Sequence, residues 1–173
     1  MKLNFKNAVT LSLLTALSFA APALCANEKE PAKTKAPAIQ VMNIRSNGIA
    51  LPVEFQVSLY EKLIDRLQQR AVFQRVYRDG DQNATAPDMI TLQCTVQSFK
   101  KGSEKLRQVT MVAGATSMTL RCEFKDKGGI SILVRDITGK VRFFGGNLQA
   151  TDDFAKKAAK VADENFSSAA KRS

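Results

Sequence analysis

Alternation of apolar and polar side chains dominates the second half of the chain. Four runs show a period of two, and they span residues 89–99, 117–127, 130–136 and 141–147. This period places every second side chain on the same face of a β-strand, so that one face packs on a core and the other meets water. Gly128-Gly129 and Thr138-Gly139-Lys140 separate the last three runs and are typical of turns. The pattern predicts an antiparallel meander between residues 89 and 147.

Apolar residues at helical spacing predict a first helix from Pro52 to about Ala71. Proline suits the first helical position, and Glu54 complements the helix dipole in the first turn. The apolar arc comprises Val53, Val57, Tyr60, Ile64, Leu67 and Ala71, widened by Leu59 and Leu63. We expect this arc to pack on the core, and the alternative is a groove for a partner.

A second helix is predicted for residues 151–168, with Thr151 as its N-cap and Asp152 and Asp153 in its first turn. Lys156 and Lys157 each follow an aspartate by four residues, a favourable spacing for ion pairs. Its apolar arc comprises Phe154, Ala155, Ala158, Val161, Ala162 and Phe166. A catalytic carboxylate dyad is the alternative interpretation of Asp152 and Asp153. We favour capping, because no partner group accompanies them in the sequence.

Two shorter runs, residues 38–46 and 72–78, are predicted as strands that precede the meander. The complete order is β-α-β-β-β-β-β-α. This order predicts an α+β fold with a mostly antiparallel sheet of about five or six strands and two helices packed on one face. Residues 38–173 suffice for one such domain.

The first 26 residues have the three parts of a secretory signal peptide. Lys2 and Lys6 make the start basic, an apolar run covers residues 9–21, and small residues end the segment. Cleavage is expected after Ala26, with Ala23 as an alternative site. The other alternative is that the segment is retained as an anchor.

Lipid anchoring at Cys25 is not expected, because Leu24 stands where that signal needs a small residue and Pro22 where it usually has a leucine. Residues 27–37 are charged and nearly free of large apolar groups, which predicts a flexible tether. No later segment approaches the roughly 20 apolar residues of a membrane span. The mature chain is therefore predicted to lack a transmembrane span and to be exported to the bacterial periplasm or exterior.

The chain is basic, and its charge suggests anionic partners. Its net charge is +10, of which Lys2 and Lys6 contribute two, so +8 remains after the predicted leader. Such a surplus favours lipid head groups or acidic polymers, and it also serves solubility alone. The candidate anion-binding residues lie on one predicted hairpin: Lys100, Lys101, Lys105, Arg107, Arg121 and Lys125.

Several classes of chemistry are excluded by the residues that the chain lacks. It contains no histidine and no tryptophan, which removes Ser-His-Asp triads, Cys-His nucleophile pairs and histidine metal ligands. Asp79, Asp81 and Asn83 are spaced like the start of a calcium loop, but Ala84 and Ile90 stand where glycine and glutamate are required. We therefore expect no metal and no cofactor.

Cys94 and Cys122 fall on the apolar faces of the first two meander strands. In a simple antiparallel pairing, residues whose numbers sum to 216 face each other, which places these two cysteines opposite one another. Export to an oxidising compartment favours a disulfide between them. Such a bond would close a loop of about 29 residues and stabilise the fold by roughly 3 kcal/mol. The alternative is a pair of buried thiols that act as small hydrophobic groups.

A set of short motifs carries a family resemblance. The motifs are Val72-Phe73-Gln74-Arg75-Val76, Ile90-Thr91-Leu92-Gln93-Cys94 with Phe99 and Gly102 after it, Arg107, Gly114, and Asp136-Ile137-Thr138-Gly139-Lys140-Val141. The set, spread over residues 39–166, resembles the bacterial exported family known as domain of unknown function 4410. That family is similar in layout to periplasmic assembly proteins such as the curli secretion component. The resemblance implies an envelope location and no defined activity, so it assigns no functional residues.

Together these features predict a secreted or periplasmic, envelope-associated protein that is not an enzyme. It would act as an accessory or assembly factor through contacts with an envelope protein. The alternative is an anion-binding module for anionic lipid head groups or acidic polysaccharide, centred on residues 100–107. Nucleic acid is not expected as a partner, because the chain is exported and has no aromatic stacking motif. An enzyme would require convergent carboxylates or a lysine of depressed pKa.

Overall fold

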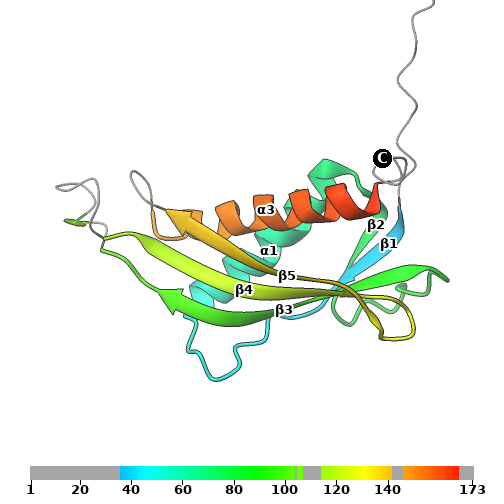
Figure 1. Cartoon of the computed structure of the whole chain (residues 1–173), viewed down its shortest axis with the longest axis horizontal. Coiled ribbons are helices and arrows are strands. Elements are labelled where there is room, and N and C mark those ends of the chain that lie inside the picture. The colour runs from blue at the N-terminus through cyan, green and yellow to red at the C-terminus, as the bar shows by residue number, and fades with distance from the viewer. Residues whose placement is uncertain (1–35, 104, 107–113, 142–145, 168–173) are drawn as a thin grey trace, which may run out of the picture. The chain divides into compact units, whose positions relative to one another are not determined.

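A computed structural model describes residues 36–103, 105–106, 114–141 and 146–167 (Figure 1). The chain divides into residues 1–32 and residues 33–173, and all described residues belong to the second unit. The elements are β1 (Ala36–Val41), α1 (Val53–Arg70), β2 (Phe73–Arg78), β3 (Met89–Lys100), β4 (Thr116–Lys125), β5 (Ser131–Val141) and α3 (Gln149–Phe166). The α+β fold class predicted from the sequence is confirmed.

The five strands form one sheet in the order β2-β1-β3-β4-β5. β3 pairs antiparallel with β4, and β4 pairs antiparallel with β5. β1 lies in the middle of the other half and runs parallel to both of its neighbours, β2 and β3. The crossover through α1 makes the β1–β2 pairing parallel, because a strand that returns through a helix enters the sheet in the same direction.

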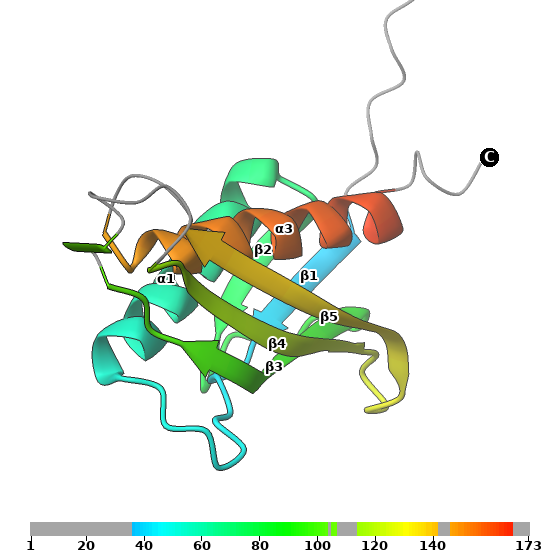
Figure 2. The same cartoon turned by 60° about the vertical axis from the view of Figure 1, so that its left-hand side comes forward.

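Both helices cover the same face of the sheet (Figures 1 and 2). Contacts of Ser58 with Thr151 and of Arg70 with Asp163 show that α1 and α3 run side by side in the same direction. The sheet residues beneath them alternate as the sequence predicts. The buried positions of β3 and β4 include Leu92, Cys94, Val96, Met118, Leu120, Cys122 and Phe124. The core therefore lies between this face and the two helices.

The buried face of α1 differs from the predicted arc. Val53 and Val57 are 73% and 57% exposed, whereas the buried residues are Phe55, Leu59, Leu63, Ile64 and Leu67. The core stripe thus repeats every four residues, because α1 packs on the sheet and on α3 together and turns its leucines toward the space between them. Ala71 lies just after the helix in a left-handed conformation and is exposed.

The turn predicted at Thr138-Gly139-Lys140 is wrong, because these residues lie within β5. The strand is continuous from Ser131 to Val141, so the predicted runs 130–136 and 141–147 are not two strands. Residues 142–145 lie outside the described part of the chain. Gly139 is needed for a different reason: a Cβ there would collide with the carbonyl oxygen of Ala150 and lie 2.7 Å from the Cβ of Phe154. Glycine therefore allows α3 to approach the strand.

The turn predicted at Gly128-Gly129 does connect β4 and β5. Gly129 has a positive φ of 80°, and the Asp126 carboxylate accepts a hydrogen bond from the Ile130 amide at 2.9 Å. A glycine is required at such a φ because a Cβ would be strained there. The position of the turn is thus correctly predicted from this dipeptide, but the connection from Lys125 to Ser131 is longer than a two-residue turn.

The start of α3 also differs from the prediction. The helix begins at Gln149, so Thr151 lies inside the first turn and is not the N-cap. Its buried hydroxyl donates to the Leu148 carbonyl at 2.6 Å and lies 2.8 Å from the Ser58 hydroxyl of α1. Thr151 therefore helps to join the two helices. The first strand also differs in its bounds from the prediction: β1 begins at Ala36, two residues before the start of the predicted strand.

Candidate functional site

The face of the sheet opposite the helices carries a ladder of polar cross-strand pairs. Arg121 and Asp136 face each other on β4 and β5, with 3.0 Å between Nε and the carboxylate. Thr119 and Thr138 pair one step along, with 2.9 Å between their hydroxyl oxygens. The hydrogen bond from Arg121 holds the pKa of Asp136 below its usual range. This part of the face is suited to contact with water.

An apolar row interrupts the polar face near the β4–β5 turn. Val134 lies on the open face, because it pairs with Glu123. Ile132 lies at a register shift between the Leu133 and Ser131 pairings, where β5 carries one residue more than β4. Ile130 stands in the turn before them. Ile130, Ile132 and Val134 are 68%, 47% and 40% exposed. We name these three residues the β5 apolar row.

The β5 apolar row lies on an edge strand. In the sheet that the described residues form, β5 has β4 as its one neighbour, so its outer edge is not paired with another strand. Figure 2 shows β5 at the border of the sheet, with the turn projecting beyond the helices. Exposed apolar groups next to a free strand edge are typical of a surface that binds another chain. The alternation in residues 130–136 reveals the strand, but because both parities carry apolar residues it does not reveal which are exposed.

The described members of the predicted anion-binding set do not converge. Lys100 and Lys101 stand at the end of β3, and Lys101 lies 3.5 Å from the Glu54 carboxylate of α1. Lys105 is exposed, and Arg107 lies outside the described residues. Arg121 pairs with Asp136, and Lys125 lies 3.1 Å from Glu123.

The length of β4 separates these charges. Ser117 pairs with Lys100 at one end of β4, and Lys125 lies at the other end of that strand. Eight residues of strand correspond to about 27 Å. The structure therefore places the basic residues along the sheet, and two of them share their charge with carboxylates on the same face.

Asp152 and Asp153 are held by cations and not by each other. Asp152 accepts hydrogen bonds from Arg66 at 2.6 Å and from Lys156 at 2.8 Å, and Asp153 pairs with Lys157 at 2.7 Å. The two i, i+4 ion pairs predicted from the sequence are thus confirmed. Partial burial opposes ionisation of Asp152, yet the hydrogen bonds of Lys156 and Arg66 hold its pKa below the usual range. A general acid needs a raised pKa, so the geometry favours a structural role for this carboxylate.

The loop that resembles a calcium site is stabilised by hydrogen bonds to backbone amides. The Asp81 carboxylate accepts a hydrogen bond from the Asn83 amide at 2.9 Å, and Asp79 accepts one from the Asn43 amide at 3.1 Å. Among the described residues no group of three cysteine, aspartate or glutamate side chains is arranged to hold a metal ion. The loop is therefore a turn with self-bonding side chains.

The hollows on this surface are open and shallow. One of about 450 Å³ lies at the β2 edge, where the polar groups include Arg75, Gln68 and Asp81. Another, of about 350 Å³, contains Asp152 and Asp153 together with Lys140 and Lys156. The aspartates of the second hollow are the ion-paired groups described above.

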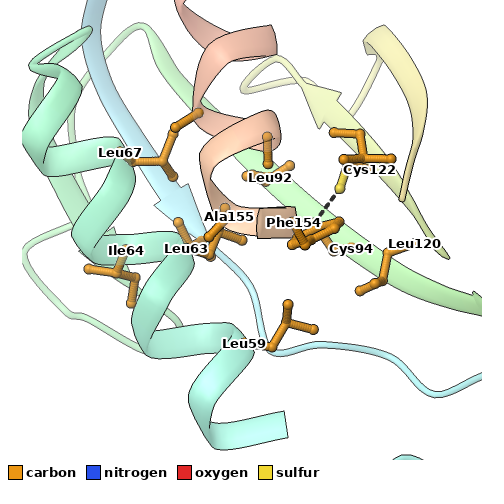
Figure 3. Close-up of a cluster of buried hydrophobic side chains, with 14 of the residues drawn as sticks. Leu59, Leu63, Ile64, Leu67, Leu92, Cys94, Leu120, Cys122, Phe154 and Ala155 are labelled. Atoms are coloured by element: carbon orange, nitrogen blue, oxygen red, sulfur yellow. Dashed lines mark hydrogen bonds between the residues drawn. The ribbon is translucent and has the colours of Figure 1, made fainter. Parts of the chain in front are cut away.

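Cys94 and Cys122 pair directly across β3 and β4, as the sequence predicts. Both are fully buried, and their Sγ atoms lie 2.7 Å apart (Figure 3). Burial raises the pKa of the Cys122 thiol well above its ordinary value, and the hydrogen bond with Cys94 acts in the same direction. Both are free cysteines in this structure, and the disulfide between them stays a prediction.

No helix of the described residues has the length and apolar content needed to cross a bilayer.

Comparison with known proteins supports the fold. No family model and no curated protein matches the chain, so the resemblance to domain of unknown function 4410 stays a prediction. A PelC dodecamer from Paraburkholderia phytofirmans, in a form with one leucine-to-methionine substitution, is similar in structure, with a TM-score of 0.56 at 14% identity over 76% of this chain and 93% of that chain. A second PelC dodecamer structure from the same organism gives 0.55 at 14% identity over 74% and 89%. Protein XCC0632 from Xanthomonas campestris, of family DUF330, gives 0.46 at 12% identity over 78% and 85%. At these identities, the two PelC structures show that the chain has a bacterial domain fold already seen in solved structures.

Proposed function

We propose that this chain is an exported accessory or assembly protein of the bacterial cell envelope, that it is not an enzyme, and that it acts through protein–protein contacts. The observation that carries the proposal is the β5 apolar row, which is exposed on an edge strand. The signal-peptide pattern of residues 1–26 supports export.

The two edge strands differ in how they are protected against pairing with another chain. β2 has six residues and exposes Gln74, Arg75 and Arg78, and short charged edges disfavour association. β5 has eleven residues and exposes Ile132 and Val134. Side chains of α3 cover the C-terminal part of this edge, because the Lys140 amide donates to Asp153 and Lys157 donates to the Thr138 carbonyl. The rest of the edge, with its apolar side chains, is suited to accept a partner by strand addition or by face-to-face packing. β5 is therefore the edge at which we place the contact.

The energy available from covering this row is sufficient to matter. Full burial of one isoleucine or valine side chain contributes about 1.5–3 kcal/mol. The three side chains of the row are already partly covered, so a partner would gain a few kcal/mol in all. Backbone hydrogen bonds to the free edge would add to this and would fix the orientation of the partner.

We propose a second copy of this chain as the partner. The two PelC structures that share the fold are dodecamers, and our proposal extends self-association to this chain. A surface that binds a different surface of the next copy builds a ring or a filament, whereas a surface that binds itself builds a two-fold dimer. Either arrangement would cover the β5 apolar row.

The test uses the processed chain purified from the envelope fraction. Its mass is measured by light scattering across a concentration series, for wild type and for the Ile132→Lys/Val134→Lys variant. We expect wild type to associate and the variant to need at least about tenfold higher concentration, which corresponds to about 1.4 kcal/mol. Val57→Lys is the control, because it introduces a lysine at an exposed valine that lies on α1 and not on β5.

Three outcomes would decide the proposal. Equal association of wild type and the double variant would show that β5 is not the contact. A monomeric wild type that cross-links to another envelope protein through β5 would exclude the second copy and keep the contact function. A monomer that captures no partner in any envelope fraction would contradict the function itself.

Anion binding is the weaker candidate. The cluster at Lys100 and Lys101 is the part of the basic set that the structure keeps together, and Lys101 already contacts Glu54. The remaining described residues of the set include Arg121 and Lys125, which lie along β4 and pair with carboxylates. An anion site at Lys100 and Lys101 would require that charge reversal there weakens binding more than the same change elsewhere on the chain.

A further inference from the structure

The cysteine pair has a geometry that the proposed contact function does not use. Cys94 and Cys122 occupy directly opposed positions of two antiparallel strands, and their side chains point into the same layer between sheet and helices. Figure 3 shows them meeting among Phe154, Leu92 and Leu120. Opposed residues in antiparallel strands have Cα atoms about 4.5–5.5 Å apart, which lies inside the range that a disulfide spans.

The two sulfurs lie close enough for a covalent bond to form with little movement of either side chain. Their Sγ atoms lie 2.7 Å apart, well inside the roughly 3.5–4.0 Å at which non-bonded heavy atoms pack best. A disulfide brings the atoms to about 2.05 Å, a shift of less than one ångström that leaves the strand register unchanged. The surrounding core therefore already holds both side chains in a position suited to the bond.

We propose that Cys94 and Cys122 form a cross-strand disulfide in the exported protein, and that the bond is made before α1 and α3 close over the sheet. The bond rests on the exported location that the proposed function assigns, since an oxidising compartment is needed.

The reaction requires a disulfide oxidant. One cysteine loses its proton and attacks the oxidant disulfide, which releases one thiol of the oxidant and forms a mixed disulfide. The second cysteine then loses its proton and attacks the mixed disulfide. This step forms the Cys94–Cys122 bond and releases the second thiol of the oxidant. Two electrons and two protons thus pass from the protein to the oxidant, which ends as two thiols.

Burial determines when this reaction takes place. Both cysteines have no solvent-exposed surface in the folded chain, and burial disfavours the Cys122 thiolate that an exchange reaction needs, because it raises the pKa of that thiol. An oxidant therefore reaches the sulfurs while the β3–β4 hairpin is still open. The same burial later shields the bond from reducing agents. The closed loop spans 28 sequence positions and contains the residues between β3 and β4.

Other roles for the pair fit the structure less well. A nucleophile or redox sensor requires a thiolate that solvent reaches, and these sulfurs are enclosed. A metal site requires more ligands, and among the described residues no third side chain of a suitable kind joins the two cysteines. A disulfide is the chemistry that remains available to two opposed sulfurs in a core.

The first test traps thiols in cells that express the full precursor. Cells are quenched in acid, the protein is denatured and alkylated without reduction, and the peptides are analysed by mass spectrometry. We expect the peptides of Cys94 and Cys122 to be joined and to carry no alkyl group. Alkylated cysteines in protein recovered from the envelope fraction would overturn the disulfide alone. Alkylated cysteines in protein recovered from the cytosol would overturn both the bond and the export on which the proposed function rests.

The second test addresses the order of events. The reduced, denatured chain is refolded in a mixture of reduced and oxidised glutathione, and in parallel the fully folded, reduced chain is placed in the same mixture. We expect oxidation during refolding to be at least about tenfold faster than oxidation of the folded chain, because closure of the core hides the sulfurs. Equal rates would overturn the order, and failure to oxidise in either sample would overturn the bond. Wild type with and without the bond is the matched pair for stability, and the midpoint of urea unfolding is expected to be higher for the oxidised form.

Discussion

Gly139 of β5 lies against Phe154 of α3 so closely that a Cβ at the glycine would come within 2.7 Å of the phenylalanine Cβ. The same hypothetical atom would collide with the Ala150 carbonyl oxygen. Both helix residues are fully buried, so this contact sets the distance between the helix layer and the sheet at the β5 side.

The Gly139→Ala substitution is therefore expected to lower the free energy of unfolding by about 1–3 kcal/mol, the usual range for an overpacked core. Urea unfolding followed by circular dichroism measures the change. Gly128→Ala is the control, because a Cβ there would meet the Asp126 side chain alone and the residue has an ordinary φ. A loss that is equal in the two variants would contradict the close approach of α3.

The buried stripe of α1 predicts that two neighbouring truncations change the free energy of unfolding by very different amounts. Leu59→Ala removes a fully buried side chain and is expected to cost about 2–5 kcal/mol. Val57→Ala shortens a residue that is 57% exposed, and a change within about 0.5 kcal/mol is expected. Thermal and urea unfolding of both variants would measure the difference, and an equal loss at Val57 and Leu59, both of which the sequence places in the apolar arc, would contradict the observed buried face.

The ion pairs of Asp152 predict a dependence of stability on pH. Hydrogen bonds from Lys156 and Arg66 lower the pKa of Asp152 in the folded chain relative to the unfolded chain, against the opposing effect of partial burial. The stabilisation is therefore present above the unfolded pKa of about 4 and is lost as the pH falls through the lower, folded pKa. Asp152→Asn is expected to cost about 0.5–1 kcal/mol at pH 7, and this cost is expected to shrink as the pH falls through the folded pKa. A difference between wild type and variant that stays constant from pH 7 to pH 2 would contradict this linkage.

The spread of basic residues predicts general and not localised attraction to anionic surfaces. Vesicles of phosphatidylglycerol and phosphatidylcholine are the probe, and binding is followed by co-sedimentation at rising salt. We expect Lys100→Glu/Lys101→Glu to weaken binding no more than Lys125→Glu/Lys127→Glu, because each variant changes the net charge equally and exposed charges are screened over about 8–10 Å. Selective loss in the first variant would favour the anion-binding module over the proposed contact function.

Strand identity and strand register in the meander follow from the sequence. Alternation in β4, and in the apolar positions of β3 as far as Val96, assigns side chains to a face, and the pairing that buries both apolar sets is the one that opposes Cys94 and Cys122. Beyond Val96 the register shifts by one residue, which the sequence does not predict. A shift by one residue would expose the whole apolar set, so the sequence carries this choice without help from the rest of the fold. The Gly128-Gly129 turn and the Asp152–Lys156 and Asp153–Lys157 pairs are local for the same reason. Each depends on residues at most a few positions apart.

The tertiary structure decided what the local pattern leaves open. Periodicity shows that α1 has an apolar side, but the position of α3 beside it decides that Leu59 and Leu63 are covered and Val53 and Val57 are not. In the sequence, Gly139 is compatible both with a turn and with a strand that packs closely under a helix. The approach of α3 in the folded chain shows that the second is correct. The exposure of Ile132 and Val134 depends on β5 being the last strand of the sheet. In each case, the burial of a side chain depends on elements that are distant in sequence. The local pattern of apolar residues does not show which of these elements packs against it.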